Sequence, residues 1–573
     1  MNIKEYFTYK KIIQSFLVIM LGVFCYAFAG SVVSIDDDVI PLSSGNIEAM
    51  FYIEDPESGS VTCIGDGLIN TTNPIINDSA IVSNHIISSP TYSSIIGNDL
   101  DISWNSIQLN DEEYQVIGTI FDLNKSPNDA FPHEWADTST FLNQASIIEN
   151  SIHTSKTLYF ASDGNDNNSG LDSSHPKKTP TDYLRNGDCT LLFKSGDIIY
   201  TKYNLVIGTN TIISTYGGSE RATISSVTNN SNPFSIYDIN NNIYAAKIDS
   251  LTKLHYNVAW IKLQDSSTIN WHKVFSYDEL KNDNDFYSDE LNQTIYLKSS
   301  SDITNKSFEF SSAAGGLYAK DGANLLCENI ELVGGVFGIN ITHWDNLVLK
   351  NCFVHYIGGR VAYSANGSPY RYGNGIQIWA DNTQNIYVYN NIVSDCFDAG
   401  ITPQITGTHT APSTNIFIFD NYIDNCMYCI ECFQQGNSAS LSNVHVDNNI
   451  LSRANDITSG YRYANNNYSA LICLWDSKDS DSCFYINNNF GIDTSEHAYS
   501  FYNVSPEGVY NFSDNTMIVS NKSTVNSAIK NIQFYSGDTD DIMLLDADEP
   551  LYKDYYEFYL ENTANYDESS NYE

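Results

Sequence analysis

Two carboxylates carry the strongest chemical signal among the 69 acidic residues of this 573-residue chain. Glycoside hydrolysis needs a pair of carboxyl groups, about 5 Å apart in retaining enzymes and about 6.5–9.5 Å apart in inverting ones. Glu431, within Cys429-Ile-Glu-Cys-Phe433, and Asp398, just before Gly400, are our candidates for acid/base or nucleophile. They lie in neighbouring strand-like segments but four positions out of register, which separates them by more than about 10 Å unless a loop folds back.

A lyase acting on a uronic-acid polymer is the second chemical option. Such an elimination needs a base near the α-proton, and a protein cation or Ca²⁺ that neutralises the substrate carboxylate. His355, Arg360 and Arg371 are the best group for this chemistry and lie in the longest segment between strand-like runs. Basic residues are scarce between positions 338 and 500, and none recurs at a fixed interval, so we favour a hydrolase over a lyase.

Aromatic and amide side chains near these residues are of the types that bind sugars. Apolar sugar faces stack on aromatic rings, while sugar hydroxyls form hydrogen bonds with amides and carboxylates. We therefore predict that five residues position a polysaccharide in a groove, although packing of a loop onto the protein is the commoner use of any single ring. The five are Gln377, Trp379, Gln404, Phe433 and Trp344.

These residues lie within a repeat that runs from Leu325 to Val519. An asparagine follows a short β-rich run seven times, at spacings of 22, 40, 30, 28, 40 and 26 residues. Such periods predict a solenoid, in which each coil buries its apolar face only by stacking on its neighbours. We predict an all-β fold, a right-handed parallel β-helix whose asparagines adopt a left-handed bend and bond to the next coil. The seven are Asn329, Asn351, Asn391, Asn421, Asn449, Asn489 and Asn515.

A second recurring segment indicates which side chains of each coil point outward. A small residue opens a strand-like run six times, and side chains alternate between the two faces of a strand. The column predicted to point inward is Ile339, Ile376, Ile401, Ile430, Leu471 and Tyr499. The first outward column is Asn340, Gln377, Thr402, Glu431, Ile472 and Ser500. The second outward column is Thr342, Trp379, Gln404, Phe433, Leu474 and Tyr502.

The beginning of the repeat region carries a resemblance to a known group. A strand at Leu158 leads into Asp163-Gly-Asn-Asp166 and Gly170, and a Pro-x-x-Thr step ends at Thr179. This arrangement resembles the first coils of secreted right-handed parallel β-helix proteins of the pectin-lyase-like superfamily. The resemblance covers about residues 157–535 and implies the architecture. The motifs that characterise the superfamily's pectate lyases and polygalacturonases are missing from this sequence, so no catalytic residue is carried over.

The remaining sequence divides into three segments and an insertion. Residues 1–29 have the lysine pair, apolar run and small-x-small site of a signal peptide or N-terminal anchor. Residues 30–155 are predicted as a β-rich module or leader of unknown role, with a helical patch near 136–149. Residues 240–310 are predicted as an insertion before the regular coils. Residues 536–573 are acidic, and we predict a C-terminal cap followed by a disordered tail.

Charge and cysteine content limit the partners. The net charge of −41 argues against nucleic acid, and an acidic polysaccharide would need a mediating cation such as Ca²⁺; we expect no other cofactor and no metal site. The ten cysteines after residue 29 show no zinc-binding spacing, so we expect small buried residues. We predict a secreted or cell-surface monomer that cleaves a polysaccharide or cell-surface glycan. A non-catalytic adhesin or glycan-binding β-helix is the alternative, because the fold serves both.

Overall fold

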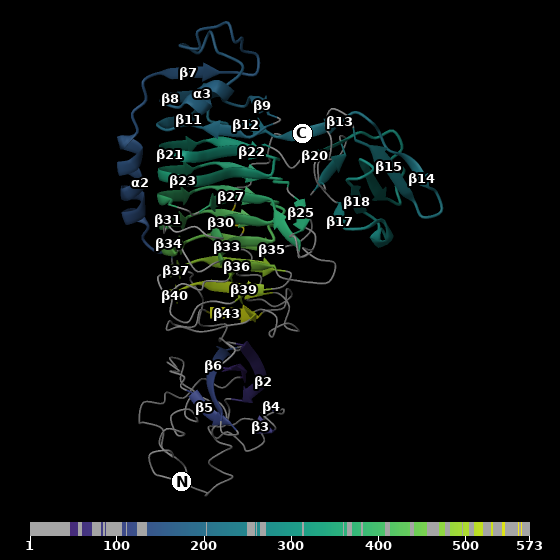
Figure 1. Cartoon of the computed structure of the whole chain (residues 1–573), viewed down its shortest axis with the longest axis vertical. Coiled ribbons are helices and arrows are strands. Elements are labelled where there is room, and N and C mark those ends of the chain that lie inside the picture. The colour runs from purple at the N-terminus through teal and green to yellow at the C-terminus, as the bar shows by residue number, and fades with distance from the viewer. Residues whose placement is uncertain are drawn as a thin grey trace, which may run out of the picture.

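The computed structural model describes residues 135–519 except 202, 249–257, 259, 264–270, 312–314, 359, 364–368, 380–381, 407–412, 436–439, 455–468, 476–481, 495–496 and 503–508. It also describes strand backbones between positions 46 and 122, those at 529–530 and 541–544, and residues 560 and 563. Parallel strands stack into a long column of coils, and a smaller module stands beside the column (Figure 1).

Each coil contributes three strands, so the column has three faces, which we call A, B and C in chain order. Face A contains β10 (Leu205–Ile207), the first parts of β21 (Leu317–Glu328) and β23 (Phe337–Lys350), β27 (Asn374–Trp379), β30 (Ala399–Thr406), β33 (Tyr428–Gln435), β36 (Ala470–Trp475), β39 (His497–Tyr502) and β42 (Ile529–Lys530). Face B contains β7 (Thr157–Phe160), β8 (Cys189–Lys194), β11 (Thr211–Tyr216), the second parts of β21 and β23, β28 (Gln384–Tyr389), β31 (Ser413–Phe419), β34 (Leu441–Asp447), β37 (Cys483–Asn487) and β40 (Val509–Ser513). Face C contains β9 (Ile198–Tyr200), β12 (Ala222–Ser225), β22 (Ile330–Val333), β24 (Phe353–His355), β29 (Ile392–Ser394), β32 (Tyr422–Asp424), β35 (Ile450–Ala454), β38 (Phe490–Thr494), β41 (Thr516–Val519) and β43 (Asp541–Leu544).

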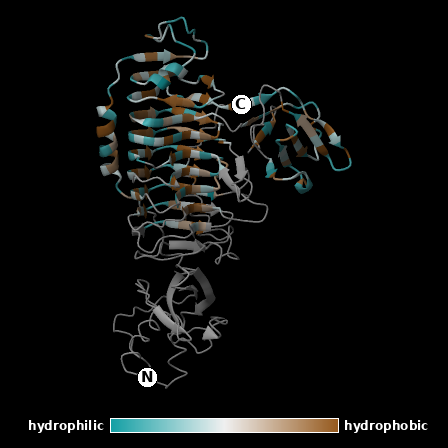
Figure 2. Ribbon diagram, in the orientation of Figure 1, coloured by the Kyte–Doolittle hydropathy of each residue, from teal (hydrophilic) through white to brown (hydrophobic). Residues whose placement is uncertain are grey.

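The interior is a stack of aliphatic side chains in register. Ile339, Ile376, Ile401 and Ile430 pair on successive coils and are fully buried, as predicted. Each such burial stabilises the fold by roughly 1.5–3 kcal/mol relative to an exposed side chain. Hydrophobic and hydrophilic residues alternate along the strands (Figure 2), which agrees with one side of each strand facing this core.

The predicted register is wrong by one residue at β36. Ile430 pairs with Ile472 rather than with Leu471, which moves Cys473 beside Glu431. Leu474, which we predicted to point outward, therefore aligns with the inward Cys432 and is buried in the core. A slip of one residue exchanges the two faces of a strand. The spacing of asparagines could not fix this register, because a long segment at 455–468 precedes the strand.

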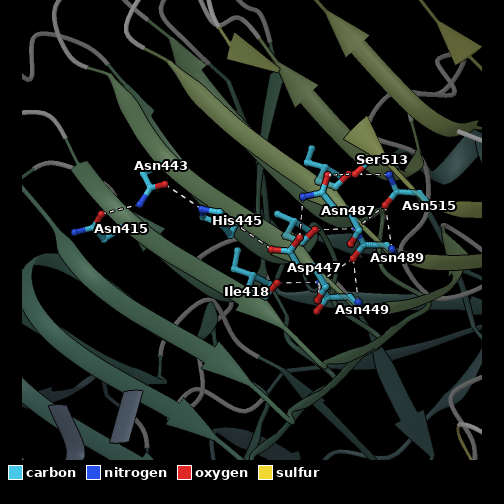
Figure 3. Close-up of polar contacts among 12 residues, drawn as sticks. Asn415, Ile418, Asn443, His445, Asp447, Asn449, Asn487, Asn489, Ser513 and Asn515 are labelled. Atoms are coloured by element: carbon cyan, nitrogen blue, oxygen red, sulfur yellow. Dashed lines mark hydrogen bonds and ion pairs between the residues drawn. The ribbon is translucent and has the colours of Figure 1, made fainter. Parts of the chain in front are cut away.

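A buried ladder of asparagines connects the coils at the corner between faces B and C. Along the ladder, the side-chain Nδ2 of each asparagine but the last donates to the Oδ1 of the next at 2.8–3.0 Å, and each Oδ1 also accepts a backbone N–H. Figure 3 shows the last three members, Asn449, Asn489 and Asn515. Each Nδ2 also donates to a backbone carbonyl of the preceding coil at 2.7–3.0 Å. The ladder satisfies polar groups inside the column. Its members are Asn391, Asn421, Asn449, Asn489 and Asn515.

The ladder position differs from the prediction in the first two coils. Ile330 and Cys352 occupy it there, and the Cys352 N–H donates to Asn391 Oδ1 at 2.9 Å. Asn329 and Asn351 stand one residue earlier, in the bend itself. In all seven coils this earlier residue has a positive φ of 52–57°, which Asn and Asp adopt most readily among residues with a side chain. The bend residues are Asn329, Asn351, Asn390, Asp420, Asn448, Asn488 and Asp514.

A second asparagine ladder, which we did not predict, lies at the corner between faces A and B. Its side-chain amides are joined at 2.7–3.1 Å from coil to coil, and every member has a positive φ of 53–62°. The sequence signal is an asparagine directly before the β-rich run of face B in six coils. The members are Asn210, Asn324, Asn346, Asn385, Asn415 and Asn443.

The loop that carries the family resemblance has a physical explanation. Asp166 accepts hydrogen bonds from the backbone N–H of Lys178 and of Thr179 and from the Thr179 hydroxyl, at 2.8–3.1 Å. The carboxylate therefore ties the Asp-Gly-Asn-Asp turn to the Pro-x-x-Thr step before β8 begins.

A helix covers much of face B. Helix α2 (Ser139–Ser151) matches the predicted helical patch and lies along the column beside β21, β23 and β31 (Figure 1). Glu149 accepts a hydrogen bond from Tyr389 at 2.9 Å and pairs with Lys350 at 2.7 Å. The Phe141 ring lies 5.0 Å from the Phe417 ring. Face B is thus a packing surface over these coils.

An inserted module separates β12 from β21. One sheet has the order β13 (Val227–Asn230), β20 (Phe308–Ser311), β16 (Ile261–Leu263), and the other has the order β14 (Ser235–Asp238), β15 (Ile243–Lys247), β19 (Thr294–Lys298), β18 (Asp285–Asp289), β17 (His272–Val274). The two sheets share a core of their own. The insertion therefore begins before the predicted position 240.

The segments at the two ends are only partly described. Residues 46–122 include a four-stranded antiparallel sheet in the order β2 (Ser60–Asn70), β1 (Asn46–Asp55), β6 (Glu112–Asp122), β5 (Ser106–Leu109). Parallel pairing continues to β43, beyond the predicted end at 535. The predicted signal peptide at 1–29 and the predicted C-terminal tail lie outside the described residues, apart from β43, 560 and 563. In the described part of the chain, no helix is long and apolar enough to cross a membrane.

The buried ladder predicts a large loss of stability on truncation. Asn449→Ala removes donors to Ile418 O and Asn489 Oδ1 and an acceptor for Asn421, inside a fully buried site. We expect the free energy of unfolding to fall by about 3 kcal/mol, because stranded buried polar groups are costly. Asn415→Gly in the partly exposed second ladder is the matched control, and we expect it to lower the free energy of unfolding by about 1 kcal/mol or less. Denaturant titrations measure both, and equal losses would contradict this account of the buried ladder.

Candidate functional site

The outward side of face A brings most of the predicted sugar-binding residues together. Gln377 pairs with Thr402 across β27 and β30, and Trp379 pairs with Gln404. Gln404 pairs in turn with Phe433 of β33. The amide side chains point away from the core yet expose at most 8% of their surface, and the Trp379 and Phe433 rings are half-buried. Face A therefore presents a recessed polar column flanked by an aromatic one.

Glu431 lies in this polar column. Its Oε2 is 3.4 Å from the hydroxyl of Thr402, and the glutamate is 6% exposed. Two coils before Glu431, Asn374 donates to Gln377 Oε1 at 3.1 Å and accepts the N–H of Ala399 at 3.0 Å. These contacts hold the amide of Gln377 in a fixed orientation. Among the described outward positions of face A, in the first part of β23 and in β27, β30, β33, β36 and β39, Glu431 is the one carboxylate.

Asp398 does not share a rung with Glu431. It precedes β30, where its N–H donates to Gly373 O and its carbonyl accepts from Met427 N–H. The residue beside Glu431 in the register is Thr402, four positions further along the strand, a distance of about 13 Å. The backbone register therefore keeps the two predicted carboxylates apart, as the sequence indicated.

The corrected register changes the aromatic column. Trp475 pairs with Phe433 and with Tyr502, so face A carries an aromatic residue at this position in β33, β36 and β39. We predicted Leu474 at this position.

His355, our candidate for lyase chemistry, lies on a different face from Glu431. It ends β24 on face C, where its Nε2 is 2.7 Å from Glu331 Oε1 and its exposure is 1%. Its ring stacks on that of Phe353 at 3.9 Å with the planes 4° apart. Its ring is thus committed to packing and an ion pair within face C.

Arg360 and Arg371 come from the hairpin β25 (Arg360–Tyr363) and β26 (Pro369–Tyr372). Arg371 pairs with Val361, so the two arginine backbones are diagonal neighbours. Their side chains lie outside the described part of the chain, and the predicted role of Arg371 stays a prediction.

Trp344 cannot stack on a sugar, which corrects another expectation. Its side chain is fully buried in the main core, at the corner between faces A and B. Gly322 on the preceding coil makes room for the ring, because a Cβ atom there would lie 2.4 Å from Trp344 Cζ3. Sequence position alone suggested an outward ring, but the corner turns the side chain inward.

Face C carries a charged network that the sequence analysis missed. Arg453 donates to Asp424 Oδ1 at 2.8 Å, and Ser452 donates to the same oxygen at 2.6 Å. Asn425 donates to Asp395 Oδ1 at 2.7 Å, and Ser394 donates to the other oxygen at 2.9 Å. The network stabilises the corner between faces C and A.

Two carboxylates of face C, Asp395 in this network and Glu331 beside His355, have pKa values shifted in opposite directions. Burial and the nearby charge of Asp424 raise the pKa of Asp395. Burial also acts to raise the pKa of Glu331, but the hydrogen bond and charge of His355, with smaller contributions from Thr223 and Arg221, lower it overall.

The corner before face A also has an unusual backbone. Four aligned residues have positive φ angles of 47–52°, and two of them, a tyrosine and an arginine, rarely adopt this conformation. Sequence offered no signal for the bend at the tyrosine and the arginine, since these two residue types do not predict a left-handed conformation. The four are Tyr356, Asp395, Asn425 and Arg453.

No metal site is apparent among the described residues. Nowhere in this part of the chain do three or more His, Cys, Asp or Glu side chains gather as metal ligands would. All nine described cysteines except Cys483 are buried.

Comparison with known proteins identifies the class. Residues 293–490 match the family described as "Right handed beta helix region". The predicted fold is confirmed: the chain is a right-handed parallel β-helix protein. A search among curated proteins found no match.

Solved structures with a similar arrangement include polysaccharide-degrading enzymes. Pectate lyase Pel9A matches at 10% identity over 68% of this chain and 80% of that one, with a TM-score of 0.36. An alginate lyase from Paenibacillus sp. str. FPU-7 matches at 9% identity over 68% and 100%, with a TM-score of 0.25. Endopolygalacturonase I from Stereum purpureum matches at 14% identity over 64% and 98%, with a TM-score of 0.25.

The network on face C predicts a pH-dependent effect of Asp395→Asn. Because the pKa of Asp395 is raised in the folded state, its charge opposes folding at neutral pH, and this cost disappears as pH falls through the folded pKa. The substitution should raise the thermal midpoint at pH 7 and leave it unchanged near pH 4. Asp172→Asn is the control, and it should lower the thermal midpoint at pH 7. Hydrogen bonds from Ser174 and His175 lower the pKa of Asp172 to about 2, so its charge favours folding. A lower midpoint for Asp395→Asn at pH 7 would contradict the assignment.

Proposed function

We propose that this protein binds a polysaccharide along face A and cleaves its glycosidic bonds, with Glu431 as an acid/base or nucleophile. The substrate would lie across several coils, and the amides of Gln377 and Gln404 and the rings of Trp379 and Phe433 would position it. Export to the cell exterior is part of the proposal and follows from the character of residues 1–29.

The observation that carries this proposal is where the chain places its insertions. From β21 onward, the connections from face B to face C are one or two residues long on every coil to β41. The inserted module and the β25–β26 hairpin enter at the corner between faces C and A, and the longer connections from β30 to β40 lie before or after strands of face A. Insertions of a solenoid gather on its binding side. The insertions of this chain therefore border face A.

The chemistry of face A fits a sugar chain. An outward column of strand side chains normally meets water, yet Gln377, Thr402, Gln404 and Glu431 are nearly buried. Polar groups at such depth need hydrogen-bond partners, and a chain of sugar hydroxyls can supply further ones. Flanking rings add the apolar contact that sugar faces require. Face B lacks such a surface on the coils that α2 covers.

One observation favours a second candidate, a glycan-binding protein without activity. Hydrolysis needs two carboxyl groups, and the register places Asp398 about 13 Å along the strand from Glu431. A binding protein needs only the polar and aromatic columns. The lyase alternative draws less support, because His355 is buried in an ion pair on face C.

Glu431→Gln separates these functions. The full chain after residue 29 is incubated with neutral and acidic polysaccharides, with and without Ca²⁺, while reducing ends and unsaturated products are measured in parallel. We expect new reducing ends without unsaturation, and a loss of about 10²–10⁴-fold in rate for Glu431→Gln, the usual contribution of an acid/base group. Glu328→Gln, the same change on face B, is the matched control and should retain activity.

The other outcomes assign the remaining functions. Unsaturated products would replace the hydrolase with a lyase. Binding by affinity electrophoresis without any cleavage, weakened by Gln377→Ala together with Trp379→Ala, would make this a binding protein. Cleavage that Glu431→Gln leaves intact would remove Glu431 from the site.

A further inference from the structure

The inserted module has two chemically different sides. On β18 and β19, Phe286, Ile295 and Leu297 point into the module core and are fully buried. The alternate residues, Tyr287 and Tyr296, point to the opposite side and are half-buried. The module thus has its main core on one side of this sheet, and on the other side Tyr287 and Tyr296 pack against a small buried cluster of Ile243, Val274 and Leu280 and keep part of their rings in solvent. The module stands beside the column of coils (Figure 1).

Four tyrosines gather on this outer surface. Tyr287 and Tyr296 are cross-strand partners whose ring centroids lie 6.2 Å apart with planes only 13° apart. Tyr296 also meets Tyr277 and Tyr237 edge-on, at 5.2 and 5.0 Å. Tyr237 is 59% exposed. We call Tyr237, Tyr277, Tyr287 and Tyr296 the tyrosine face.

A small residue keeps this face open at one edge. Ala245 of β15 is the register partner of Tyr296 and lies on the same side of the sheet. Its side chain is too short to cover the ring. A partly exposed apolar surface with a polar rim is typical of a binding site.

The rim of the tyrosine face is polar and acidic. Asp238 and Asp278 lie near Tyr277, and Asp289 and Glu290 lie near Tyr287. The two nearby lysines, Lys247 and Lys298, each donate to a backbone carbonyl at 2.7 Å. Negative charge around the rings disfavours an anionic ligand. The available groups suit a neutral ligand with an apolar side and many hydroxyls.

The hydroxyls of Tyr277, Tyr287 and Tyr296 remain protonated hydrogen-bond donors over the ordinary pH range. Burial, and then the neighbouring carboxylates, raise the pKa values of Tyr277 and Tyr287. Burial and nearby groups, first the Tyr237 hydroxyl and then Asp289, do the same for Tyr296. Each ring can therefore offer a flat apolar surface and a neutral O–H donor.

We propose that the tyrosine face is a second carbohydrate-binding site, which takes a chain of uncharged sugars. Sugar rings stack on Tyr287 and Tyr296, and Tyr237 closes over the exposed edge. Hydroxyls bond with the tyrosine O–H groups and the carboxylates of Asp238 and Asp289. This site stands apart from face A and does not depend on cleavage there.

Binding of soluble neutral polysaccharides tests the site. Xylan, mixed-linkage glucan, galactomannan and dextran are each run in affinity electrophoresis and calorimetry with the full chain carrying Glu431→Gln, which slows any cleavage on face A. We expect at least one to bind, and polygalacturonate to bind far more weakly at low salt. Tyr287→Ala with Tyr296→Ala should weaken the tightest interaction by about 10-fold or more, since each ring contact contributes about 3–10-fold.

Matched variants separate stacking from folding. Tyr237→Ala alters an exposed ring and should fold normally, yet weaken binding by about 3–10-fold. Tyr287→Phe with Tyr296→Phe keeps the rings and should retain most of the affinity. Tyr203→Ala, at a 77% exposed tyrosine on the column, should change nothing. Thermal midpoints of all variants show which of them keep the fold.

Several results would overturn the proposal. Neutral polysaccharides that bind equally well to wild type and to Tyr237→Ala would place the interaction elsewhere. Preference for polygalacturonate would contradict the charge argument. A change only in self-association, measured by light scattering, would make the tyrosine face a contact between copies of this chain. Cleavage of a short oligosaccharide is measured separately for the wild type and for the tyrosine variants. If all of them cleave it equally, face A works independently of the tyrosine face, so the two proposals can fail separately.

Discussion

A left-handed bend at one corner sets the geometry of the whole column. In seven consecutive coils the chain leaves face B through an Asn or Asp residue at a φ of 52–57°. In five of them the next residue is a buried asparagine whose amide bonds to the same amide one coil away. Because each amide must meet its neighbour at hydrogen-bond distance, a coil cannot shift along the strand direction without stranding buried polar groups. The corner therefore fixes the register from which the columns of faces A and C follow.

This constraint also explains where the sequence is free to vary. From β21 to β41 the corner between faces B and C carries no insertion, and over the last five of these coils the ladder needs one asparagine directly after one bend. The two ends of face A carry no such buried ladder, although the corner toward face B has a partly exposed one. Insertions of very different length enter at those ends at little cost in loop closure. A rigid scaffold beside variable loops is the usual arrangement of a binding surface.

Much of the fold could be predicted from sequence because a residue pattern that recurs in every coil indicates the same local structure in every coil. Asn421, Asn449 and Asn489 recur after apolar runs, and that pattern indicates stacked coils without further information. The prediction failed where a single residue decides the outcome. Asn329 and Asn351 belong to the bend rather than to the buried ladder, because periodicity locates a corner but not the residue within it.

The candidate site could be predicted only in part, for related reasons. Gln377, Gln404 and Glu431 are on the predicted side of face A because strand alternation is a local property. Trp344 is buried because it stands at a corner, where alternation breaks down, and Gly322 of another coil receives its ring. The partnership of His355 with Glu331 crosses between coils and depends on a register that no single segment encodes.

With two carbohydrate-binding surfaces on one chain, each surface would need less affinity for the polysaccharide. The module joins the column between β12 and β21 and shares apolar contacts with it through Trp260, Val333 and Phe397. Such contacts limit how far the two surfaces can move apart, so a polysaccharide held at one is present at a high effective concentration at the other. Each surface can then bind weakly. Weak binding on face A suits catalysis, because interactions that are stronger in the transition state than in the bound substrate are the ones that raise the rate. The tyrosine face would thus supply attachment and leave the lone glutamate of face A free to act on successive bonds.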